Sequence, residues 1–330
     1  MVRPRRPMAT PRFAMATIAD FLAEWRSDSP YIVAHTSGST GTPKAIHLLK
    51  SDMMLSAANT VDFFSLGSNS VLALPLSADY IAGKMMAVRA LVCGGKLLEL
   101  PVSNRIELPG PVDFLAVVPS QLESVLQQPR EAVGALLVGG APMTAEQERA
   151  LAASGIPAWI GYGMTETCSH IALRRIGRDK VFHAVGDVTF SVDENSCLII
   201  RSDKFSWRTL ATRDVVRLIS DTAFEWVGRA DNVINSGGIK IHPEQLEADI
   251  RALLPHLPDF YITSVQHPRW GQAPAMVIGP GAVDANLRDV LHAGLKDSRH
   301  TPYKIYVTDS LPRTSNNKVK RIIPDQKYEI

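Results

Sequence analysis

Strand-like and helix-like segments alternate through the first half of the sequence, and this pattern limits the fold more than any other feature. Short apolar runs have the length of strands, and the longer stretches between them have helical spacing. A strand followed by a helix, repeated, predicts a parallel α/β architecture. The alternating segments include YIVAHT (31–36), SDMMLSAANTVDFF (51–64), SVLALPL (70–76), AGKMMAVRALVCG (82–94), FLAVVP (114–119), ALLVGG (135–140) and TAEQERALAAS (144–154).

The pattern changes after about residue 181. Residues 181–203 alternate apolar and polar positions around the turn-forming residues 193–195, which predicts a β-rich subdomain built from hairpins. A further α+β unit begins after Gly228, with helices expected near 243–254 and 285–295 and strands near 260–266 and 304–311. We therefore expect an α/β fold with a large N-terminal domain over residues 1–228 and a small C-terminal lid domain over residues 229–330.

Composition excludes several classes of function. The 330 residues carry 35 basic and 33 acidic side chains, so the net charge of +2 predicts no nucleic-acid partner. Cys93, Cys168 and Cys197 lie far apart without metal-ligand spacing, which indicates packing residues in a reducing compartment. No run of eighteen apolar residues occurs, and no apolar segment follows the N-terminal arginines. We expect a cytoplasmic protein without a membrane span.

Residues 32–46, IVAHTSGSTGTPKAI, are unusually rich in hydroxyl groups and glycine. A Walker phosphate loop requires glycine directly before the lysine and a hydroxyl after it. Here Pro43 precedes Lys44 and Ala45 follows it, so that interpretation fails. From composition alone, a simple strand-to-helix turn and a phosphate-binding loop remain equal alternatives.

Six motifs in order resolve this ambiguity, because together they resemble the adenylate-forming superfamily of acyl-CoA and aryl-CoA synthetases. They span residues 36–321, and the first corresponds to the phosphate loop of that family. The motifs are TSGSTGTPK (36–44), VGGAPM (138–143), GYGMTET (161–167), TRDV (212–215), GRADNVINSGGIKIHPEQLE (228–247) and LPRTSNNKVKR (311–321).

The resemblance implies ATP and Mg²⁺ as cofactors and assigns a nucleotide site. Tyr162 would lie against adenine, Asp214 and Arg229 would bind the ribose, Thr165 would contact the α-phosphate and Glu166 would hold Mg²⁺. The alternative for Tyr162 is an ordinary half-buried aromatic residue. The remaining residues expected at the nucleotide are Thr36, Ser37, Gly38, Ser39, Thr40, Gly41, Lys44, Gly139, Gly140 and Gly163.

The resemblance also implies a catalytic lysine and a moving lid. Lys318 would bridge the acyl carboxylate and the α-phosphate, and Asp231 would be the hinge of the lid. Ser236, Gly237 and Gly238 would line the path of coenzyme A, the second substrate. The sequence departs from the family at two positions, Asn317 and Arg213, where the family usually has glycine.

The phosphate loop begins at residue 36, much earlier than is usual in the family, so we expect a shortened N-terminal domain. This compact form resembles the o-succinylbenzoate–CoA ligases of menaquinone synthesis, whose substrate has a second carboxylate that needs a cation. Lys84 is the first candidate, with Arg89 behind it and Gly83 allowing close approach, while Ser77 and His170 are weaker candidates. The alternative is that Lys84 and Arg89 lie on the outer face of an amphipathic helix.

Three functions remain open at this point: an o-succinylbenzoate–CoA ligase, another aryl- or short-acyl-CoA ligase, and a nucleotide-binding protein without catalytic activity. The presence of Lys318, Glu166 and Asp214 argues against the third. The partners expected are a small carboxylic acid, ATP and coenzyme A. The sequence leaves the oligomeric state open, with a homodimer as one option.

Overall fold

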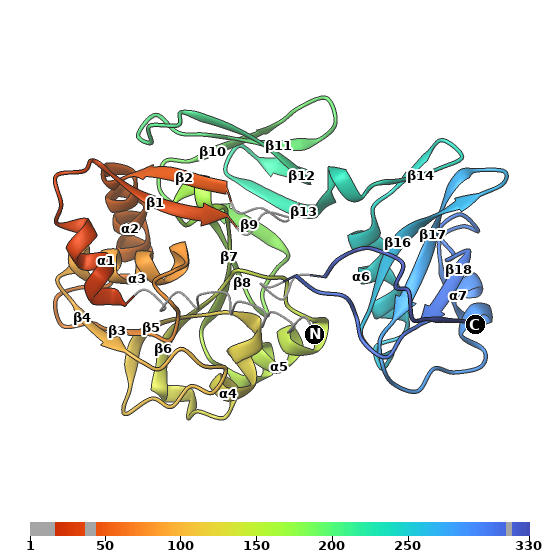
Figure 1. Cartoon of the computed structure of the whole chain (residues 1–330), viewed down its shortest axis with the longest axis horizontal. Helices are drawn as coiled ribbons and strands as arrows, with labels where there is room; N and C mark the ends of the chain where they lie inside the picture. The colour runs from red at the N-terminus through yellow and green to blue at the C-terminus, as the bar shows by residue number, and fades with distance from the viewer. Residues whose placement is uncertain (1–16, 37–43, 315–318) are drawn as a thin grey trace, which may run out of the picture.

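Two separate sheets carry most of the chain (Figure 1). The computed structural model describes residues 17–36, 44–314 and 319–330. Within these residues, a sheet of eleven strands spans residues 71–229 and a sheet of six strands spans residues 234–329. The α/β fold with a β-rich part and a smaller C-terminal α+β unit is therefore confirmed.

Half of the large sheet is parallel, in the order β4-β3-β5-β6-β7. Its strands are β3 (Val71–Leu74), β4 (Lys96–Glu99), β5 (Val112–Val117), β6 (Val133–Val138) and β7 (Ala158–Gly163). Its helices are α1 (Ile18–Trp25), α2 (Lys50–Phe64), α3 (Ile81–Cys93), α4 (Leu122–Leu126) and α5 (Ala145–Ser154), with short 3-10 turns at Pro119–Gln121 and Arg130–Ala132.

Helices cover both faces of this parallel half, which explains its continuous apolar strands. On β5, Phe114 and Ala116 pack into the core formed with α1, α2 and α3. The alternate residues Leu115 and Val117 pack into a second core that includes α4 and α5. Successive side chains of a strand point to opposite faces of the sheet, and because helices cover both faces, both sets are buried.

The other half of the large sheet is antiparallel, in the order β7-β8-β9-β13-β12-β11-β10. Asp193 closes the predicted hairpin between β10 and β11, and its Oδ1 accepts from the backbone N–H of Asn195 at 2.8 Å. The strands are β8 (His170–Arg175), β9 (Val181–Ala184), β10 (Thr189–Val192), β11 (Cys197–Arg201), β12 (Thr209–Ser220) and β13 (Ala223–Arg229).

The segment 31–36 lies outside the large sheet, contrary to the simple strand-helix pattern. As β1 (Tyr31–Thr36), it pairs antiparallel with β2 (Lys44–Leu49), and this hairpin forms a sheet of its own among the described residues. The predicted segments run from the loop directly to the helix, so β2 was not predicted. The sequence signal for β2 is the short alternation of apolar Ile46, polar His47 and apolar Leu48.

The small sheet packs against α6 (Pro243–Leu253) and α7 (Leu287–Gly294) through a core that includes Leu246, Ile250 and Leu291. The 3-10 turn η4 (Ala230–Asn232) connects it to β13 of the large sheet. Its strands are β14 (Ile234–Ser236), β15 (Ile239–Ile241), β16 (Phe260–His267), β17 (Gly271–Ile278), β18 (Lys304–Val307) and β19 (Tyr328–Glu329).

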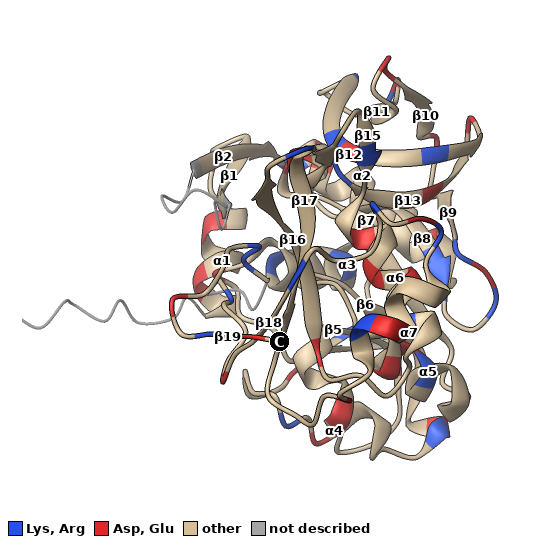
Figure 2. Cartoon of the chain, turned by 90° about the vertical axis from the view of Figure 1, so that its right-hand side faces the viewer, with Lys and Arg blue, Asp and Glu red and all other residues tan. Residues whose placement is uncertain are grey.

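Charge is mixed rather than segregated on this fold. Basic and acidic residues are interspersed over the elements of both sheets (Figure 2). In the part of the chain that the structure describes, no helix combines the length and the apolar character needed to cross a lipid bilayer.

Candidate active site

Several predicted motifs meet at one edge of the large sheet. Gly139 and Gly140 follow β6, and β7 ends at Gly163; because these neighbouring strands are parallel, both ends lie at the same edge. The 3-10 turn η3 (Thr165–Thr167) follows, and both strands of the β1–β2 hairpin contact it. The structure thus brings the two strands that flank the predicted phosphate loop into contact with the TET motif.

Two of these glycines are explained by backbone geometry. A Cβ atom at Gly163 would lie 2.2 Å from the carbonyl oxygen of Ser169, which directly precedes β8, so no side chain fits there. Gly140 has φ of +81°, a left-handed conformation that favours glycine. A side chain at Gly139 would instead meet no atom within 4 Å. The backbone there is open to approach by a ligand.

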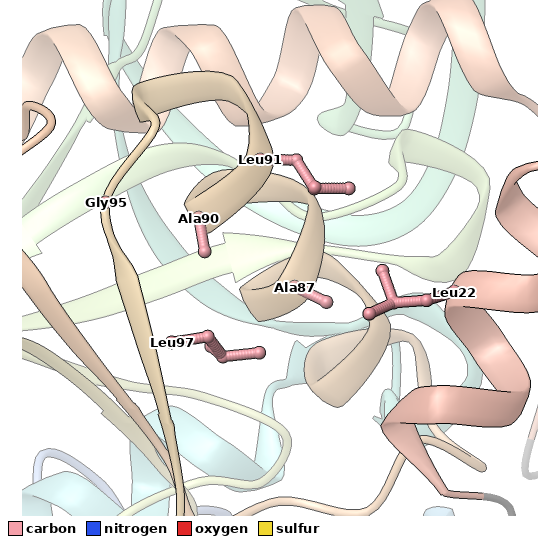
Figure 3. Close-up of a pocket in the computed structure, with 6 residues that line it drawn as sticks. All are labelled: Leu22, Ala87, Ala90, Leu91, Gly95 and Leu97. Carbon is pink, nitrogen blue, oxygen red and sulfur yellow. The ribbon is translucent and has the colours of Figure 1, made fainter.

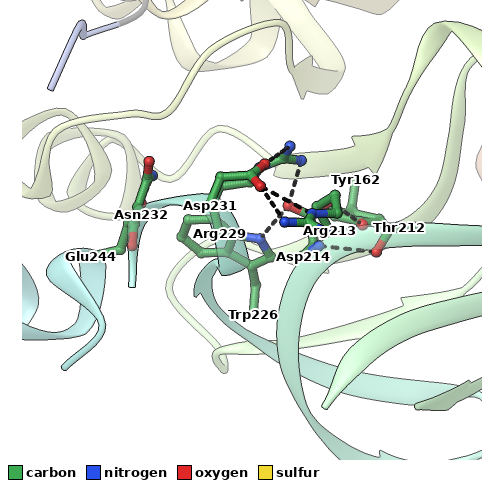
Figure 4. Close-up of polar contacts among 9 residues, drawn as sticks. All are labelled: Tyr162, Thr212, Arg213, Asp214, Trp226, Arg229, Asp231, Asn232 and Glu244. Carbon is green, nitrogen blue, oxygen red and sulfur yellow. Dashed lines mark hydrogen bonds and ion pairs between the residues drawn. The ribbon is translucent and has the colours of Figure 1, made fainter. Parts of the chain in front are cut away.

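Asp214 is the centre of a polar cluster between β7, β12 and β13 (Figure 4). Its carboxylate accepts from the Tyr162 hydroxyl at 2.8 Å and pairs with Arg229 at 3.2 Å. Asp214 and Arg229 are register partners on antiparallel strands, which explains why residues fifteen positions apart meet. The indole N–H of Trp226 lies 3.4 Å from the same carboxylate. Trp226 was not among the predicted site residues. It lies opposite Val216, two residues along β12 from Asp214, and the sequence has no signal for this pairing.

Tyr162 is half-buried, with its ring edge-on to Phe182 and Phe224 at centroid distances of 5.9 and 5.1 Å. Burial and the nearby Asp214 carboxylate raise the pKa of its hydroxyl far above the usual value, so the hydroxyl stays protonated and donates. The hydroxyl therefore fixes the ring beside the predicted ribose carboxylate. The stacking of Tyr162 on adenine stays a prediction.

Asp231 lies between two arginines. Arg213 donates to its Oδ1 from Nη2 at 2.6 Å and from Nε at 3.0 Å, and Arg229 donates to its Oδ2 at 3.2 Å. Burial would raise the pKa of Asp231, but the two arginines lower it below the usual range. Arg229 thus links the predicted ribose residue to the predicted hinge residue (Figure 4).

Arg89 and His170 form a buried cluster with Ser169 and Thr60. Arg89 is 2% exposed and donates to the hydroxyl of Ser169, while its Nη1 lies 3.5 Å from the Met86 sulfur. Its Nε has no hydrogen-bond partner among the described residues. Burial lowers the pKa of Arg89 to about 10, and no described carboxylate offsets this effect.

The ring of His170 bridges this cluster to α2. Its Nδ1 lies 3.3 Å from the Ser169 hydroxyl and its Nε2 lies 3.3 Å from the Thr60 hydroxyl. Burial, followed by the positive charge of Arg89, holds the pKa of His170 well below its usual value. The imidazole is therefore neutral at pH 7 and offers polar contacts without charge.

Lys84 lies apart from this cluster, on the side of α3 that faces α1. Its Nζ is 3.5 Å from the Glu24 carboxylate and 5.1 Å from the centroid of the Phe21 ring. The predicted alternative, an outward-facing position for both Lys84 and Arg89, is wrong because both residues are buried. Gly83 has a packing role, since a Cβ there would lie 2.2 Å from the carbonyl oxygen of Ser77.

The predicted metal residue is accessible. Glu166 is exposed and Thr165 is half-buried, both on η3. The described residues contain no group of three or more side chains that could form a metal cage. One exposed carboxylate fits Mg²⁺, which usually takes one or two carboxylates and completes its shell with phosphate and water.

The predicted coenzyme A segment begins the small sheet. Ser236 is fully buried, and its hydroxyl has no partner among the described residues. Gly237 and Gly238 have φ of +58° and +86°, and the N–H of Gly237 donates to the carbonyl of Trp270 at 2.9 Å. The predicted residues Ser37, Gly38, Ser39, Thr40, Gly41 and Lys318 lie outside the described residues, as do the side chains of Thr36 and Lys44.

A separate pocket of about 140 Å³ lies between α1, α3 and β4 (Figure 3). Its lining includes Leu22, Ala87 and Leu97 and is almost entirely apolar. None of the predicted site residues that the structure describes lines it. We therefore place the candidate site at the sheet edge and not in this pocket.

Comparison with known proteins identifies the family. A family model described as "AMP-binding enzyme" matches residues 10–200. The chain belongs to this family. The matched range includes the first three motifs, from the phosphate loop to GYGMTET.

Relatives of this AMP-binding enzyme cover the rest of the chain. The chain is 28% identical to a probable 2-succinylbenzoate–CoA ligase of Mycobacterium tuberculosis, over 91% of this chain and 85% of the relative. A solved AMP-forming acyl-CoA synthetase/AMP-acid ligase II-like protein from Dyadobacter fermentans is 31% identical, with a TM-score of 0.61 and coverage of 92% and 91%.

The fold also matches the o-succinylbenzoate CoA synthetase MenE of Bacillus subtilis, solved with the acyl-adenylate intermediate OSB-AMP. That structure has a TM-score of 0.73 at 20% identity and covers 88% of this chain and 67% of MenE. The predicted resemblance to the adenylate-forming superfamily is thus confirmed. The roles of individual site residues stay predictions.

Proposed function

We propose that this chain adenylates 2-succinylbenzoate with ATP and transfers the acyl group to coenzyme A, a step of menaquinone biosynthesis. Membership of the AMP-binding enzyme family supports the general class, an AMP-forming acid–CoA ligase. The names of the relatives from Mycobacterium tuberculosis and Bacillus subtilis support the particular acid.

The buried guanidinium of Arg89 is the observation that carries the choice of acid. A buried cation is unfavourable unless an anion pairs with it, and Arg89 has no carboxylate partner among the described residues. Lys84, the first candidate from sequence, already pairs with Glu24. The structure therefore favours Arg89 over Lys84 as the group that receives the second, aromatic carboxylate. Ser169 and neutral His170 would orient that carboxylate by hydrogen bonds.

In the first half-reaction, the aliphatic carboxylate attacks the α-phosphorus of ATP and pyrophosphate leaves. Asp214, Arg229 and Tyr162 would hold the adenosine, and the hydroxyls and amides of residues 36–44 would hold the departing phosphates. Lys318 would neutralise the charge that develops between the acid and the α-phosphate. Mg²⁺ bound through Glu166 would supply further charge neutralisation on the phosphates.

In the second half-reaction, the thiol of coenzyme A displaces AMP from the acyl-adenylate. We propose a rotation of residues 229–330 relative to residues 1–228 about Asp231, which would bring Ser236, Gly237 and Gly238 to the pantetheine arm. The ion pairs of Asp231 with Arg213 and Arg229 would hold the orientation seen here. Such exposed pairs contribute only about 0–1 kcal/mol each, so they permit rotation.

A coupled pyrophosphate-release assay tests the proposal. Purified protein is given ATP, Mg²⁺ and coenzyme A with 2-succinylbenzoate, benzoate, 4-phenylbutyrate or a fatty acid, and each thioester product is identified by mass spectrometry. We expect efficient turnover only with the aromatic dicarboxylate, and weak but measurable turnover of 4-phenylbutyrate, which lacks the second carboxylate. Preferred turnover of benzoate or a fatty acid would assign another acyl-CoA ligase, and ATP binding without adenylation of any acid would refute the enzyme.

A further inference from the structure

The carboxylate of Glu244, in the first turn of α6, lies where the two sheets are connected. Its Oε1 accepts from the side-chain amide of Asn232 at 2.5 Å and pairs with Nη2 of Arg321 at 3.3 Å. Asn232 ends the turn η4 that joins the large sheet to the small sheet. One oxygen atom therefore joins the inter-sheet connection to the C-terminal segment.

The second oxygen of Glu244 is buried without a partner. Among the described residues, no donor reaches Oε2, and a Cβ at Gly228 of β13 would lie 2.5 Å from it. The Glu244 side chain is only 10% exposed. A buried acceptor without a hydrogen bond is unfavourable, so packing against the large sheet costs free energy in this orientation. Packing alone does not explain a carboxylate at this position.

Arg321, the partner of Glu244 in the C-terminal segment, makes several further contacts. Its guanidinium forms an ion pair with Glu247 of α6, with Nη2 at 3.0 Å from Oε2, and Nη1 donates to the carbonyl of Ile262 at 2.7 Å. Its own carbonyl accepts from the Thr263 hydroxyl at 2.8 Å. Arg321 thus fixes the C-terminal segment at residues 319–322 to α6 and β16.

We propose that Glu244 is a positioning residue that couples the inter-sheet connection at Asn232 to the C-terminal segment at Arg321. When residues 229–330 rotate, the segment near Arg321 then moves with the hinge as one body. This inference rests on the proposed two-step reaction for its functional meaning. Glu247 is the matched control, because it binds Arg321 and has no contact with Asn232.

Amide hydrogen exchange on the full chain without ligand tests the coupling directly. We expect Asn232→Ala and Glu244→Gln each to raise exchange about tenfold in both segments, 229–234 and 319–322, since the first removes a hydrogen bond to the carboxylate and the second removes the negative charge that strengthens both of its contacts. Glu247→Gln should raise exchange in 319–322 alone. If Asn232→Ala leaves 319–322 unchanged, or if Glu247→Gln raises exchange in both segments, the coupling does not exist. Asn232→Ala keeps the test decisive if Glu244→Gln fails to fold.

Kinetics separate this role from simple stabilisation. Glu244 touches no proposed substrate site, so Glu244→Gln should leave KM for ATP unchanged and lower kcat. Acyl-adenylate should then accumulate on the enzyme in the presence of coenzyme A, and Glu247→Gln should not cause this accumulation. Equal loss in both variants would overturn the positioning role. If the wild-type chain adenylates no acid, the proposed function fails while hydrogen exchange still decides the coupling.

Discussion

Replacing Arg89 by methionine should have opposite effects on stability and on activity. Burial lowers the pKa of this guanidinium from 12.5 to about 10 in the ligand-free protein. At about 1.4 kcal/mol per pKa unit, the buried charge costs roughly 3 kcal/mol. Methionine has a similar length and no charge, and part of the gain is offset by the lost contacts with Ser169 and Phe114. We expect a net stabilisation of about 1–2 kcal/mol, or a rise in Tm of roughly 2–5 °C.

The same variant should lose selectivity for the dicarboxylic acid. A hydrogen bond to a charged group contributes about 1.5–3 kcal/mol, and a guanidinium can donate two such bonds to one carboxylate. Arg89→Met should therefore lower kcat/KM for 2-succinylbenzoate by about 10²- to 10³-fold. For 4-phenylbutyrate, which lacks the aromatic carboxylate, kcat/KM should change by no more than about threefold.

Differential scanning calorimetry and the pyrophosphate-release assay measure the two effects. Lys84→Met is the matched control, because that buried cation already has Glu24 as a partner and should not affect the choice of acid. If Arg89→Met lowers kcat/KM equally for both acids, Arg89 does not bind the second carboxylate. If Lys84→Met produces the selective loss instead, the original sequence-based order of the two residues is correct.

Three further outcomes are expected. Lys318→Ala should lower the rate of acyl-adenylate formation by several powers of ten and spare thioester formation from added acyl-adenylate in single-turnover assays; equal loss in both steps would exclude the rotating lid. Gly83→Ala should lower the free energy of unfolding by about 1–3 kcal/mol or more in urea titrations, because its Cβ would overlap the Ser77 carbonyl, and an unchanged midpoint would contradict the packing role. The pKa of His170 in the folded protein lies well below its usual value of about 6.5, so below that pH the unfolded chain binds a proton that the folded chain does not. The free energy of unfolding should therefore fall by about 1.4 kcal/mol for each pH unit below about pH 6.5. His170→Gln should lose this component of the slope, and identical slopes would contradict it.

The strand and helix pattern predicted the architecture where local residues decide it. The buried strands β5 and β6 and the helices α2, α3 and α6 lie at the predicted segments, since apolar spacing reports burial directly. The pairing of β1 with β2 was not predicted, because a short alternation of apolar and polar residues in β2 does not by itself specify a partner strand or a register. Likewise, the contact between Asp214 and Arg229 depends on the register of β12 and β13, which apolar spacing does not determine.

The two cations of α3 show why candidate residues for an acyl site can be named from the sequence, while the choice between them cannot be made from it. Lys84 and Arg89 are five residues apart, so at 100° per residue their side chains point roughly 140° apart around the helix axis. A narrow polar face of the helix cannot hold both side chains. Helix geometry alone therefore argues against the alternative in which both residues lie on the outer face. Their ranking depends on Glu24 and Ser169, which lie 60 and 80 residues away in the sequence. Glu24 neutralises Lys84, whereas Ser169 leaves the charge of Arg89 uncompensated. Under the proposed function, this difference in partners is the reason why Arg89, and not Lys84, would receive the second carboxylate.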